Sequence, residues 1–271
     1  MAQIKQAVIP IAGLGTRFLP LSKILAKELF PLAVKPTVQY IIEEAQAAGI
    51  KKIVFVTRPG KQINLDYFKE QLKEKNITFC QVFQKQPLGD GHAVLQAEKI
   101  IKKEPCLVLF GDDIVDSKIP CSLQLAKVFN KYKKTVIALY RLPKEKLSSY
   151  GIVRVEKIRP RLYKIKDIIE KPSFDQAPSN LAVVGKYIID SQVFDLLKNT
   201  PSKAKGEIRL AGAFNEMLKR GKTIYGYEFE GKWLECGNKE AYLKSNLYFI
   251  KKLLKEKSGR GGTGRRASFR S

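Results

Sequence analysis

The sequence predicts an α/β fold with a doubly wound, mostly parallel sheet and a small β extension, and two patterns carry this prediction. Along residues 1–141, short apolar runs that suit buried strands alternate with amphipathic helical segments. Such alternation is typical of parallel strands joined by crossover helices. Further along, shorter strand-like runs follow one another before the helices resume. The 271 residues suffice for one large domain with a substantial core.

The elements of the first part are recognised from their periodicity. Residues 52–57 read K-I-V-F-V-T and residues 106–110 read C-L-V-L-F, as expected of buried strands. Residues 37–48 place apolar side chains on one helical face, and Gly49 can cap the end of that helix. The other expected elements are strands at 6–11, 78–83 and 135–140 and helices at 62–75, 92–103 and 121–132.

The second part of the chain has no Pro- or Gly-rich linker before it and no internal repeat. We therefore expect a single domain over residues 1–257, with a first part at 1–141 and a second part at 142–257. The strands expected in the second part are 152–155, 162–169, 181–189 and 223–229, and the helices are 191–197, 207–220 and 239–256. Residues 258–271 are rich in Gly, Ser and Arg and are expected to form a disordered basic tail.

The charge is strongly positive, because 50 Lys and Arg stand against 26 Asp and Glu, a net charge of +24. Such a charge favours nucleic acid, an anionic membrane or phosphorylated small molecules as partners. Nucleic acid is disfavoured, because no binding motif occurs outside the tail. A membrane-spanning segment is excluded, because no apolar run approaches the roughly 20 residues that cross a bilayer, and no membrane partner is expected. The start of the chain also lacks the features of a signal peptide, so a cytoplasmic protein is expected.

The residue types available for catalysis are limited. The four cysteines, Cys80, Cys106, Cys121 and Cys236, form no C-x-x-C pair, and they are expected to be reduced thiols rather than zinc ligands. The single histidine, His92, excludes a multi-histidine metal site. Its place near the expected start of a helix favours a structural or phosphate-proximal role. The chemistry is therefore expected to depend on lysines, arginines and carboxylates.

A glycine-containing turn, A-G-L-G-T-R, directly follows the first strand. Gly13 and Gly15 allow backbone amides to approach a phosphate closely, and Arg17 can pair with phosphate oxygens through its forked guanidinium. Phe18 stands where the dinucleotide fingerprint requires a third glycine. Taken alone, the two glycines are equally compatible with an ordinary turn.

Two further groups of charged residues sharpen the interpretation. Lys23, Lys27 and Lys35 follow the turn closely, and several cations in this position suit a triphosphate. The alternative is a solvated basic loop. Asp112 and Asp113 follow a buried strand, at the edge where such sheets bind ligands. A carboxylate there suits Mg²⁺, and the alternative is a turn or helix cap.

These residues belong to a longer pattern. The signature G-L-G-T-R-F-L-P…K-E-L-F-P…K-P resembles that of nucleotidyltransferases that make sugar nucleotides. The resemblance covers roughly residues 4–249, through G-D-G-H-A-V, D-D, Y-G, E-K-P and G-E-I in order. The segment A-P-S-N-L-A-V-V-G-K-Y is similar to the bacterial UTP–glucose-1-phosphate uridylyltransferases in particular.

The resemblance implies a Rossmann-like nucleotidyltransferase fold with a nucleotide-binding first part, a sugar-binding β extension and a homo-oligomeric state. It also implies UTP and glucose 1-phosphate as substrates and Mg²⁺ as cofactor. The implied reaction is in-line attack of the sugar-phosphate oxygen on the α-phosphorus of UTP, giving UDP-glucose and pyrophosphate. It needs no general base, because the attacking phosphate is already ionised.

Individual roles follow from the matching positions. Arg17 and Lys27 would hold the triphosphate as pyrophosphate leaves, and Gln84 would read the nucleobase, since an amide offers a donor and an acceptor. The other nucleotide-binding positions are Ala12, Gly13, Gly15 and Gly89. The sugar phosphate would be bound by Asp113, Gly151, Glu170, Lys171 and Val184. The metal ligands would be Asp112 and Glu235.

Three departures from the family pattern keep alternatives open. Glu235 replaces the aspartate that precedes Cys-Gly, Ala211-Gly212 replaces a Thr-Asp pair, and Ala26 replaces a proline. The first two motivate a catalytically weak paralogue that only binds nucleotide sugars. The segment W-L-E-C-G also partly matches a glucose-1-phosphate thymidylyltransferase, which would use dTTP instead of UTP.

Overall fold

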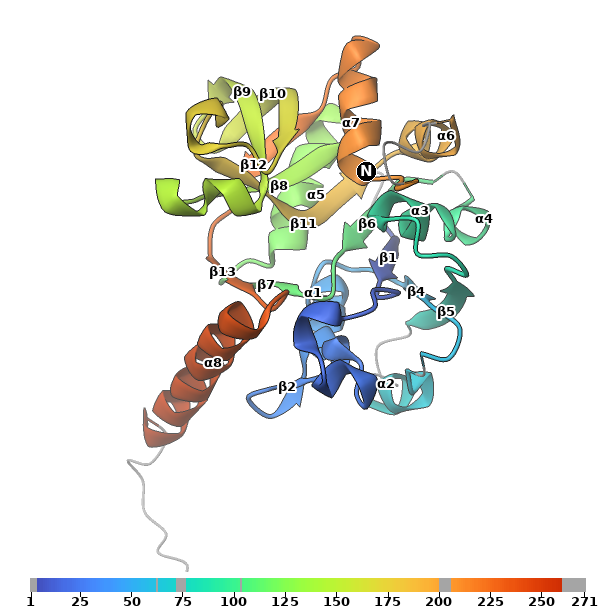
Figure 1. Ribbon diagram of the computed structural model, residues 1–271, viewed down its shortest axis with the longest axis vertical. Helices are drawn as coiled ribbons and strands as arrows, with labels where there is room; N and C mark the ends of the chain where they lie inside the picture. The colour runs from blue at the N-terminus through green and yellow to red at the C-terminus, as the bar shows by residue number, and fades with distance from the viewer. Residues whose placement is uncertain (1–3, 62, 72–76, 103, 200–205, 260–271) are drawn as a thin grey trace, which may run out of the picture.

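One nine-stranded sheet runs through both parts of the chain, in the order β5-β4-β1-β6-β11-β8-β12-β10-β9 (Figure 1). The structure is a computed structural model that describes residues 4–61, 63–71, 77–102, 104–199 and 206–259. The sheet is thus continuous across the expected boundary at residue 141. The division of the chain into a nucleotide-binding and a sugar-binding part stays a prediction.

The first four strands of this order are parallel, as predicted. They are β1 (Gln6–Pro10), β4 (Lys52–Thr57), β5 (Thr78–Phe83) and β6 (Cys106–Leu109). β1 and β6 are buried along their whole length and β4 nearly so, because helices cover both faces of this part of the sheet. All four carboxyl ends consequently meet at one edge, where the residues that follow each strand come together.

Beyond β6 the sheet is mixed rather than mostly parallel. Its strands are β8 (Val136–Arg141), β9 (Gly151–Arg159), β10 (Leu162–Glu170), β11 (Leu181–Ile189) and β12 (Tyr225–Glu228). β11 pairs antiparallel with both β6 and β8, and among the strands that the structure describes beyond β6 only β8 and β12 pair in parallel. The nine-residue β11 joins the two parts, so the expected β extension continues the central sheet instead of forming one of its own.

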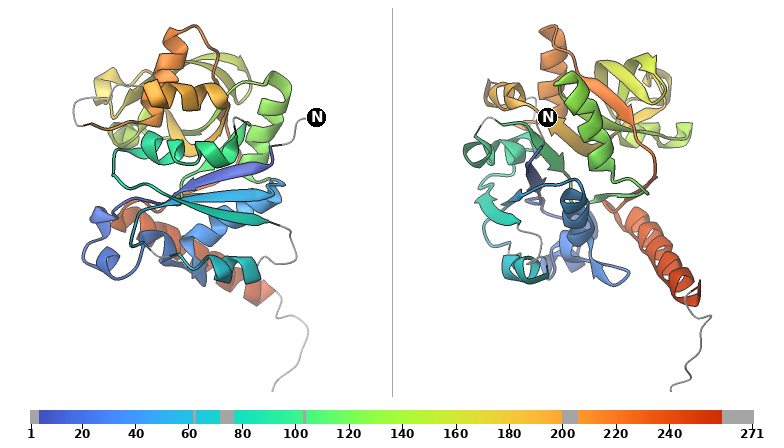
Figure 2. Two further views of the ribbon diagram at one scale, coloured as in Figure 1. Left: turned by 90° about the vertical axis from the view of Figure 1, so that its right-hand side faces the viewer. Right: turned by 180° about the vertical axis from the view of Figure 1, so that it is seen from behind.

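Helices lie on both faces of the sheet, which confirms the doubly wound prediction (Figure 2). The helices are α1 (Thr37–Ala47), α2 (Leu65–Gln71), α3 (Asp90–Leu95), α4 (Glu98–Ile101), α5 (Cys121–Tyr132), α6 (Ser191–Asn199), α7 (Leu210–Lys219) and α8 (Lys239–Gly259). α1 and α5 pack in one apolar cluster, and α3, α6 and α7 pack in another. Three of the four free cysteines lie buried, and Cys80 is partly exposed.

Several helix boundaries differ from the prediction. The helix expected at 92–103 is divided into α3 and α4, and it begins at Asp90. The helix expected at 207–220 begins at Leu210, whose amide donates to Asp90 Oδ1 at 3.0 Å. α8 includes the first two residues of the expected tail, and residues 260–271 lie outside the described residues. The same holds for residues 62 and 72–75 of the helix expected at 62–75.

Two small sheets were not predicted. One joins β2 (Pro31–Leu32) to β3 (Lys35–Pro36), and the other joins β7 (Asp113–Asp116) to β13 (Lys232–Glu235). The antiparallel register of the second pair places Glu235 opposite Asp113. This pairing brings the last part of the chain to the end of β6.

Among the described residues, none of the helices combines the length and apolar character that crossing a bilayer requires. The cytoplasmic location expected from the sequence stays a prediction.

A buried ion pair connects β11 to α1. Lys186 Nζ lies 2.6 Å from Glu44 Oε2, and the Lys186 side chain is fully buried. Replacing Lys186 by methionine is expected to lower the free energy of unfolding by about 3–5 kcal/mol, because Glu44 would keep a buried charge without its cation. Lys35→Met is the control. Lys35 pairs at the surface with Glu43, which neighbours Glu44 on α1, and loss of a surface ion pair costs about 1 kcal/mol or less. Equal losses in urea unfolding would contradict this account.

Candidate active site

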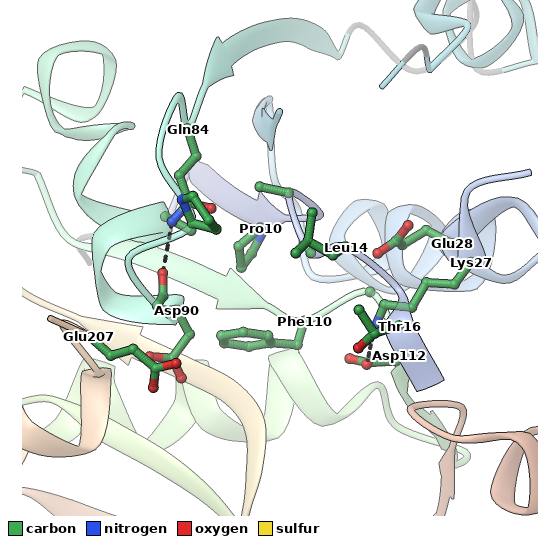
Figure 3. A pocket seen from close by; sticks show the side chains of 16 residues that line it. Pro10, Leu14, Thr16, Lys27, Glu28, Gln84, Asp90, Phe110, Asp112 and Glu207 are labelled. Atoms are coloured by element: carbon green, nitrogen blue, oxygen red, sulfur yellow. Dashed lines mark hydrogen bonds and ion pairs between the residues drawn. The ribbon is translucent and has the colours of Figure 1, made fainter. Parts of the chain in front are cut away.

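A pocket of about 380 Å³ lies at the carboxyl ends of β1, β5 and β6 (Figure 3). It is lined by residues of the glycine-containing turn, by Lys27, and by the segments that follow β5 and β6. Of the residues predicted to bind nucleotide or metal, it includes Ala12, Gly13, Lys27, Gln84, Gly89 and Asp112. The structure therefore brings together residues that are up to 100 positions apart in the chain.

Two glycines in and beside the pocket, Gly15 and Gly89, have backbone conformations that favour glycine. Gly15 has φ +69°, in the left-handed region, and a Cβ there would lie 3.1 Å from Ser22 Cβ. Gly89 has φ +100°, and a Cβ there would lie 2.5 Å from the Ile208 carbonyl oxygen. Gly13 is exposed and has open space beside it. Larger side chains at Gly15 or Gly89 would therefore distort the turn and the entry to α3.

Gln84 follows β5, is buried and lines the pocket. Its side-chain nitrogen donates to the Gly89 carbonyl oxygen at 2.9 Å and lies 3.1 Å from His92 Nδ1. The protein thus engages the amide nitrogen, and no residue that the structure describes donates a hydrogen bond to the amide oxygen, which can receive a donor from a ligand. His92 also lies 3.1 Å from the Gln96 amide, and burial lowers the pKa of His92. These contacts give the histidine a structural role.

Lys27 and Asp112 form the central ion pair of the pocket. Lys27 Nζ lies 2.5 Å from Asp112 Oδ2, and Figure 3 shows the two side chains meeting at one end of the pocket. Burial would lower the pKa of Lys27, but Asp112, Glu28 and Asp113 raise it above its ordinary value. Burial would raise the pKa of Asp112, but Lys27 and Arg17 lower it. Both partners are therefore charged at neutral pH.

Arg17 is exposed at the end of the turn and acts electrostatically on Asp112. It also lowers the pKa of Tyr150, although burial and Glu235 together raise that pKa overall. The predicted proximity of Arg17 to the aspartate pair is thus consistent with the structure. Its position at an open edge of the site suits a group that meets an incoming anion.

Asp113 is held by the protein on both carboxylate oxygens. Trp233 Nε1 donates to Oδ1 at 2.8 Å, and the Gly185 amide donates to Oδ2 at 3.1 Å. A Cβ on Gly185 would lie 2.3 Å from Asp113 Oδ2, so this approach requires glycine. Burial and the neighbouring Asp112 raise the pKa of Asp113 to about 7. Asp113 thus connects β7 to β11 and β13.

Glu235 reaches the aspartates through the β7–β13 pairing. Its Oε2 accepts a hydrogen bond from the Tyr150 hydroxyl, and the Cys236 amide donates to the Asp112 carbonyl oxygen at 2.7 Å. A Cβ on Gly237 would lie 3.1 Å from Glu235 Oε1 and 3.3 Å from Asp112 Oδ2. The two carboxylates therefore border one small space that Gly237 leaves open.

The predicted sugar-binding residues lie beside this region, outside the lining of the 380 Å³ pocket. Glu170 pairs with Gly151 across β9 and β10, and a Cβ on Gly151 would lie 2.9 Å from Glu170 Oε1. Lys171 has φ 47°, and its amide donates to the Tyr150 carbonyl oxygen. Val184 is buried in the core, so only its backbone is placed to meet a ligand.

Comparison with known proteins identifies the family. A profile described as nucleotidyl transferase matches residues 6–252. The chain belongs to the nucleotidyl transferase family. It is 38% identical to UTP–glucose-1-phosphate uridylyltransferase 2 of Staphylococcus saprophyticus, over 93% of this chain and 94% of that one. It is also 38% identical to UTP–glucose-1-phosphate uridylyltransferase of Bacillus subtilis, over 92% of each.

The structures agree with this assignment. A UDP-glucose pyrophosphorylase solved in complex with UDP-glucose is similar with a TM-score of 0.84 and 36% identity, over 92% of this chain and 99% of that one. A UTP-bound UGPase from Acinetobacter baumannii is similar with a TM-score of 0.80 and 33% identity, over 93% and 99%. The Rossmann-like nucleotidyltransferase fold is therefore confirmed.

Sequence reasoning gave no role to several residues of this nucleotidyl transferase site. Asp90 Oδ1 accepts hydrogen bonds from the Gly91 and Leu210 amides and so joins α3 to α7. Tyr150 holds Glu235, and Phe110 lines the pocket beside Gln84 and Asp112. The motifs G-D-G-H and Y-G contain Asp90 and Tyr150, but nothing in their local pattern reveals partners more than 80 residues away.

Proposed function

We propose that this chain transfers a uridylyl group from UTP to glucose 1-phosphate, giving UDP-glucose and pyrophosphate. The observation that carries the proposal is the Lys27–Asp112 pair beside a glycine turn, in a pocket at the ends of parallel strands. The relatives named above act on UTP and glucose 1-phosphate by their names, and a similar structure holds UDP-glucose. The fold places such a pocket where open α/β sheets bind nucleotides.

In this proposal the uracil lies against Gln84, whose amide oxygen receives the ring N–H while the backbone of Ala12, Gly13 and Gly89 surrounds the nucleoside. Arg17, Lys27 and the backbone of Gly15 bind the triphosphate. The sugar-phosphate oxygen attacks the α-phosphorus in line, a new P–O bond forms, and the bond to pyrophosphate breaks. The two cations stabilise the negative charge that develops on the leaving group.

Glucose 1-phosphate is proposed to lie on the side of Tyr150 and β11. Lys171 binds its phosphate, Glu170 accepts hydrogen bonds from sugar hydroxyls, and the Gly151 and Val184 backbones border the ring. The carboxylates of Asp90, Asp113 and Glu170 all act electrostatically on Tyr187, and together with burial they raise its pKa. Asp113 contributes to this side mainly by accepting hydrogen bonds that hold β11 and Trp233 in place.

Mg²⁺ is the proposed cofactor, held by Asp112 and Glu235. Two carboxylates bordering one small space fit an ion that prefers hard oxygen ligands and that takes its remaining ligands from water and substrate phosphates. Within the described residues no group of three or more acidic, histidine or cysteine side chains could hold a metal by itself. When bound, the ion would neutralise phosphate charge.

The test is pyrophosphate release with each pair of UTP or dTTP and glucose 1-phosphate or another sugar phosphate. We expect the largest kcat/KM for UTP with glucose 1-phosphate. A larger value for dTTP would favour the thymidylyltransferase alternative. Slow turnover with every pair, together with a gain from Glu235→Asp, would favour the weak paralogue.

Tyr150 provides a further prediction, because its hydroxyl donates to a proposed metal ligand. Tyr150→Phe is expected to raise the Mg²⁺ concentration needed for half-maximal activity by about 10- to 100-fold, since such a partner orients the ligand it contacts. Tyr163→Phe is the matched control, because the Tyr163 hydroxyl donates to Glu228 at 2.8 Å, outside the lining of the pocket. An unchanged Mg²⁺ dependence in Tyr150→Phe would contradict the role of Glu235.

We also propose that copies of the chain associate through α8, which extends from the body (Figure 1). Leu243, Leu247, Ile250 and Leu254 are exposed on this helix, at the alternating spacing of four and three residues that forms a coiled-coil seam. A second copy presents the same stripe and can cover it. Leu247→Lys is expected to reduce the mass measured by light scattering to that of a monomer. A monomeric wild-type chain would contradict this proposal.

A further inference from the structure

A second pocket, of about 250 Å³, lies on the other side of the glycine turn. We call it the loop pocket. It shares Gly13, Leu14 and Lys27 with the 380 Å³ pocket, which we call the nucleotide pocket, and its remaining walls come from Gly15, residues 22–26, Leu29 and the loop after β4. The turn and Lys27 thus separate two adjacent spaces.

Four cationic side chains line the loop pocket: Lys23, Lys27, Arg58 and Lys61. Lys27 is paired with Asp112, and Lys61 Nζ is paired with Glu28 Oε2 at 2.6 Å. Among the described residues, no carboxylate forms an ion pair with Lys23 or Arg58. No acidic residue lines the pocket within that part of the chain. The loop pocket therefore carries an excess of positive charge.

Two polar atoms of this wall are buried without a hydrogen-bond partner in the described part of the chain: Ser22 Oγ and Arg58 Nε. Buried polar groups are normally hydrogen-bonded, because a donor without an acceptor loses its contact with water and gains nothing in return. A hydroxyl and a guanidinium N–H that share one cationic pocket are both able to donate to an oxyanion.

The backbone holds these groups in place. The left-handed conformation of Gly15 brings the turn to within contact of Ser22, since a Cβ on Gly15 would lie 3.6 Å from Ser22 Oγ. Lys61 Nζ donates to the carbonyl oxygens of Ile11 and Gly13 at 2.5 and 3.3 Å. Lys61, paired with the buried Glu28, therefore holds the backbone of the turn through these two carbonyl oxygens. Ser22 and Lys61 lie against the turn in the absence of any ligand.

We propose that the loop pocket binds a compact inorganic phosphate anion, pyrophosphate or phosphate, through Ser22, Lys23 and Arg58. Arg58 offers a guanidinium fork to two phosphate oxygens, and Ser22 Oγ donates to a third. The anion thus lies in the loop pocket, separated by Lys27 from the pocket that holds the nucleoside. This binding requires no turnover, so it is independent of the proposed uridylyl transfer.

The experiment is calorimetric titration of the full chain with pyrophosphate and, separately, with phosphate, in the absence of any nucleotide. The variants are Arg58→Gln and Ser22→Ala, with Arg154→Gln as the control, because Arg154 is exposed on β9. We expect Arg58→Gln to raise the Kd of the tighter anion about 10-fold or more, and Ser22→Ala to raise it by a smaller factor. Arg154→Gln should leave it within about twofold.

Each outcome decides the proposal. A larger effect of Arg58→Gln than of Arg154→Gln supports the site, and the anion with the lower Kd is then its natural ligand. Equal effects of both arginine variants would mean a general charge effect and would overturn it, as would wild-type affinity in both Arg58→Gln and Ser22→Ala. Thermal unfolding of each variant identifies a folding defect. If Arg58→Gln is misfolded, the Kd of Ser22→Ala decides the proposal. The titration does not need turnover, so a chain that is inactive with UTP would still show whether the loop pocket binds the anion.

Discussion

Replacing Lys27 by methionine is expected to lower kcat for UDP-glucose formation by about 100- to 1,000-fold. Lys27 is the charged side chain that lies between Asp112 and the glycine turn, and its pKa is raised by the surrounding carboxylates, so it carries its charge throughout the neutral range. Methionine keeps the length of the side chain and removes the charge that stabilises the departing pyrophosphate. Initial rates at saturating UTP measure this effect.

The matched control is Lys166→Met, which removes a surface lysine paired with Glu156 on the far strands β9 and β10. This variant should retain nearly all of the wild-type kcat. A Lys27→Met enzyme with more than about a tenth of the wild-type kcat would contradict the assigned role, because removing one charge-stabilising donor normally costs more than that.

Asp112→Asn is expected to lower kcat by at least about 1,000-fold, because it removes a proposed metal ligand and the partner of Lys27 together. Asparagine preserves the shape of the side chain, and its oxygen is a weaker ligand for Mg²⁺ than a carboxylate oxygen. The loss should not be recovered at high Mg²⁺ if the charge of Asp112 also positions Lys27. Rates measured over a range of Mg²⁺ concentrations separate the two contributions.

Asp116→Asn serves as its control, since Asp116 ends strand β7, which begins directly after Asp112, but pairs with Lys252 and accepts from Tyr248, outside the lining of the pocket. Its kcat should stay within about twofold of wild type. If Asp112→Asn and Asp116→Asn have similar rates, the effect comes from the β7–β13 sheet and not from the site.

The central strands were predictable because their signals are local. Residues 52–57, 78–83 and 181–189 have apolar runs of strand length, and these strands have the expected boundaries. The direction in which strands pair could not be predicted from their own residues. β11 pairs antiparallel with β6 and β8, and its sequence is compatible with either direction. The four-residue strands β7 and β13 are too short to show a period, and their pairing joins segments more than 100 residues apart.

In the site, too, some residues were predictable from local sequence and others depend on tertiary contacts. Ala12, Gly13, Gln84 and Asp112 each follow a strand, and the parallel order of β5, β4, β1 and β6 brings them to one pocket. Glu235 was placed only through the family resemblance, because its approach depends on the β7–β13 pairing. The Tyr150 contact and the Lys61–Glu28 pair had no sequence signal, since they depend on tertiary distances alone. The roles assigned to these side chains stay proposals.

The most direct test of the account is a phosphorus NMR time course of the wild-type chain with UTP, glucose 1-phosphate and Mg²⁺, beside the same mixture with Asp112→Asn. We expect resonances of UDP-glucose and pyrophosphate to grow in equal amounts with the wild-type chain and to stay near the background rate with the variant. Orthophosphate release without a sugar nucleotide, or equal product formation by both proteins, would contradict the claim that Lys27 and Asp112 form a uridylyl-transfer site.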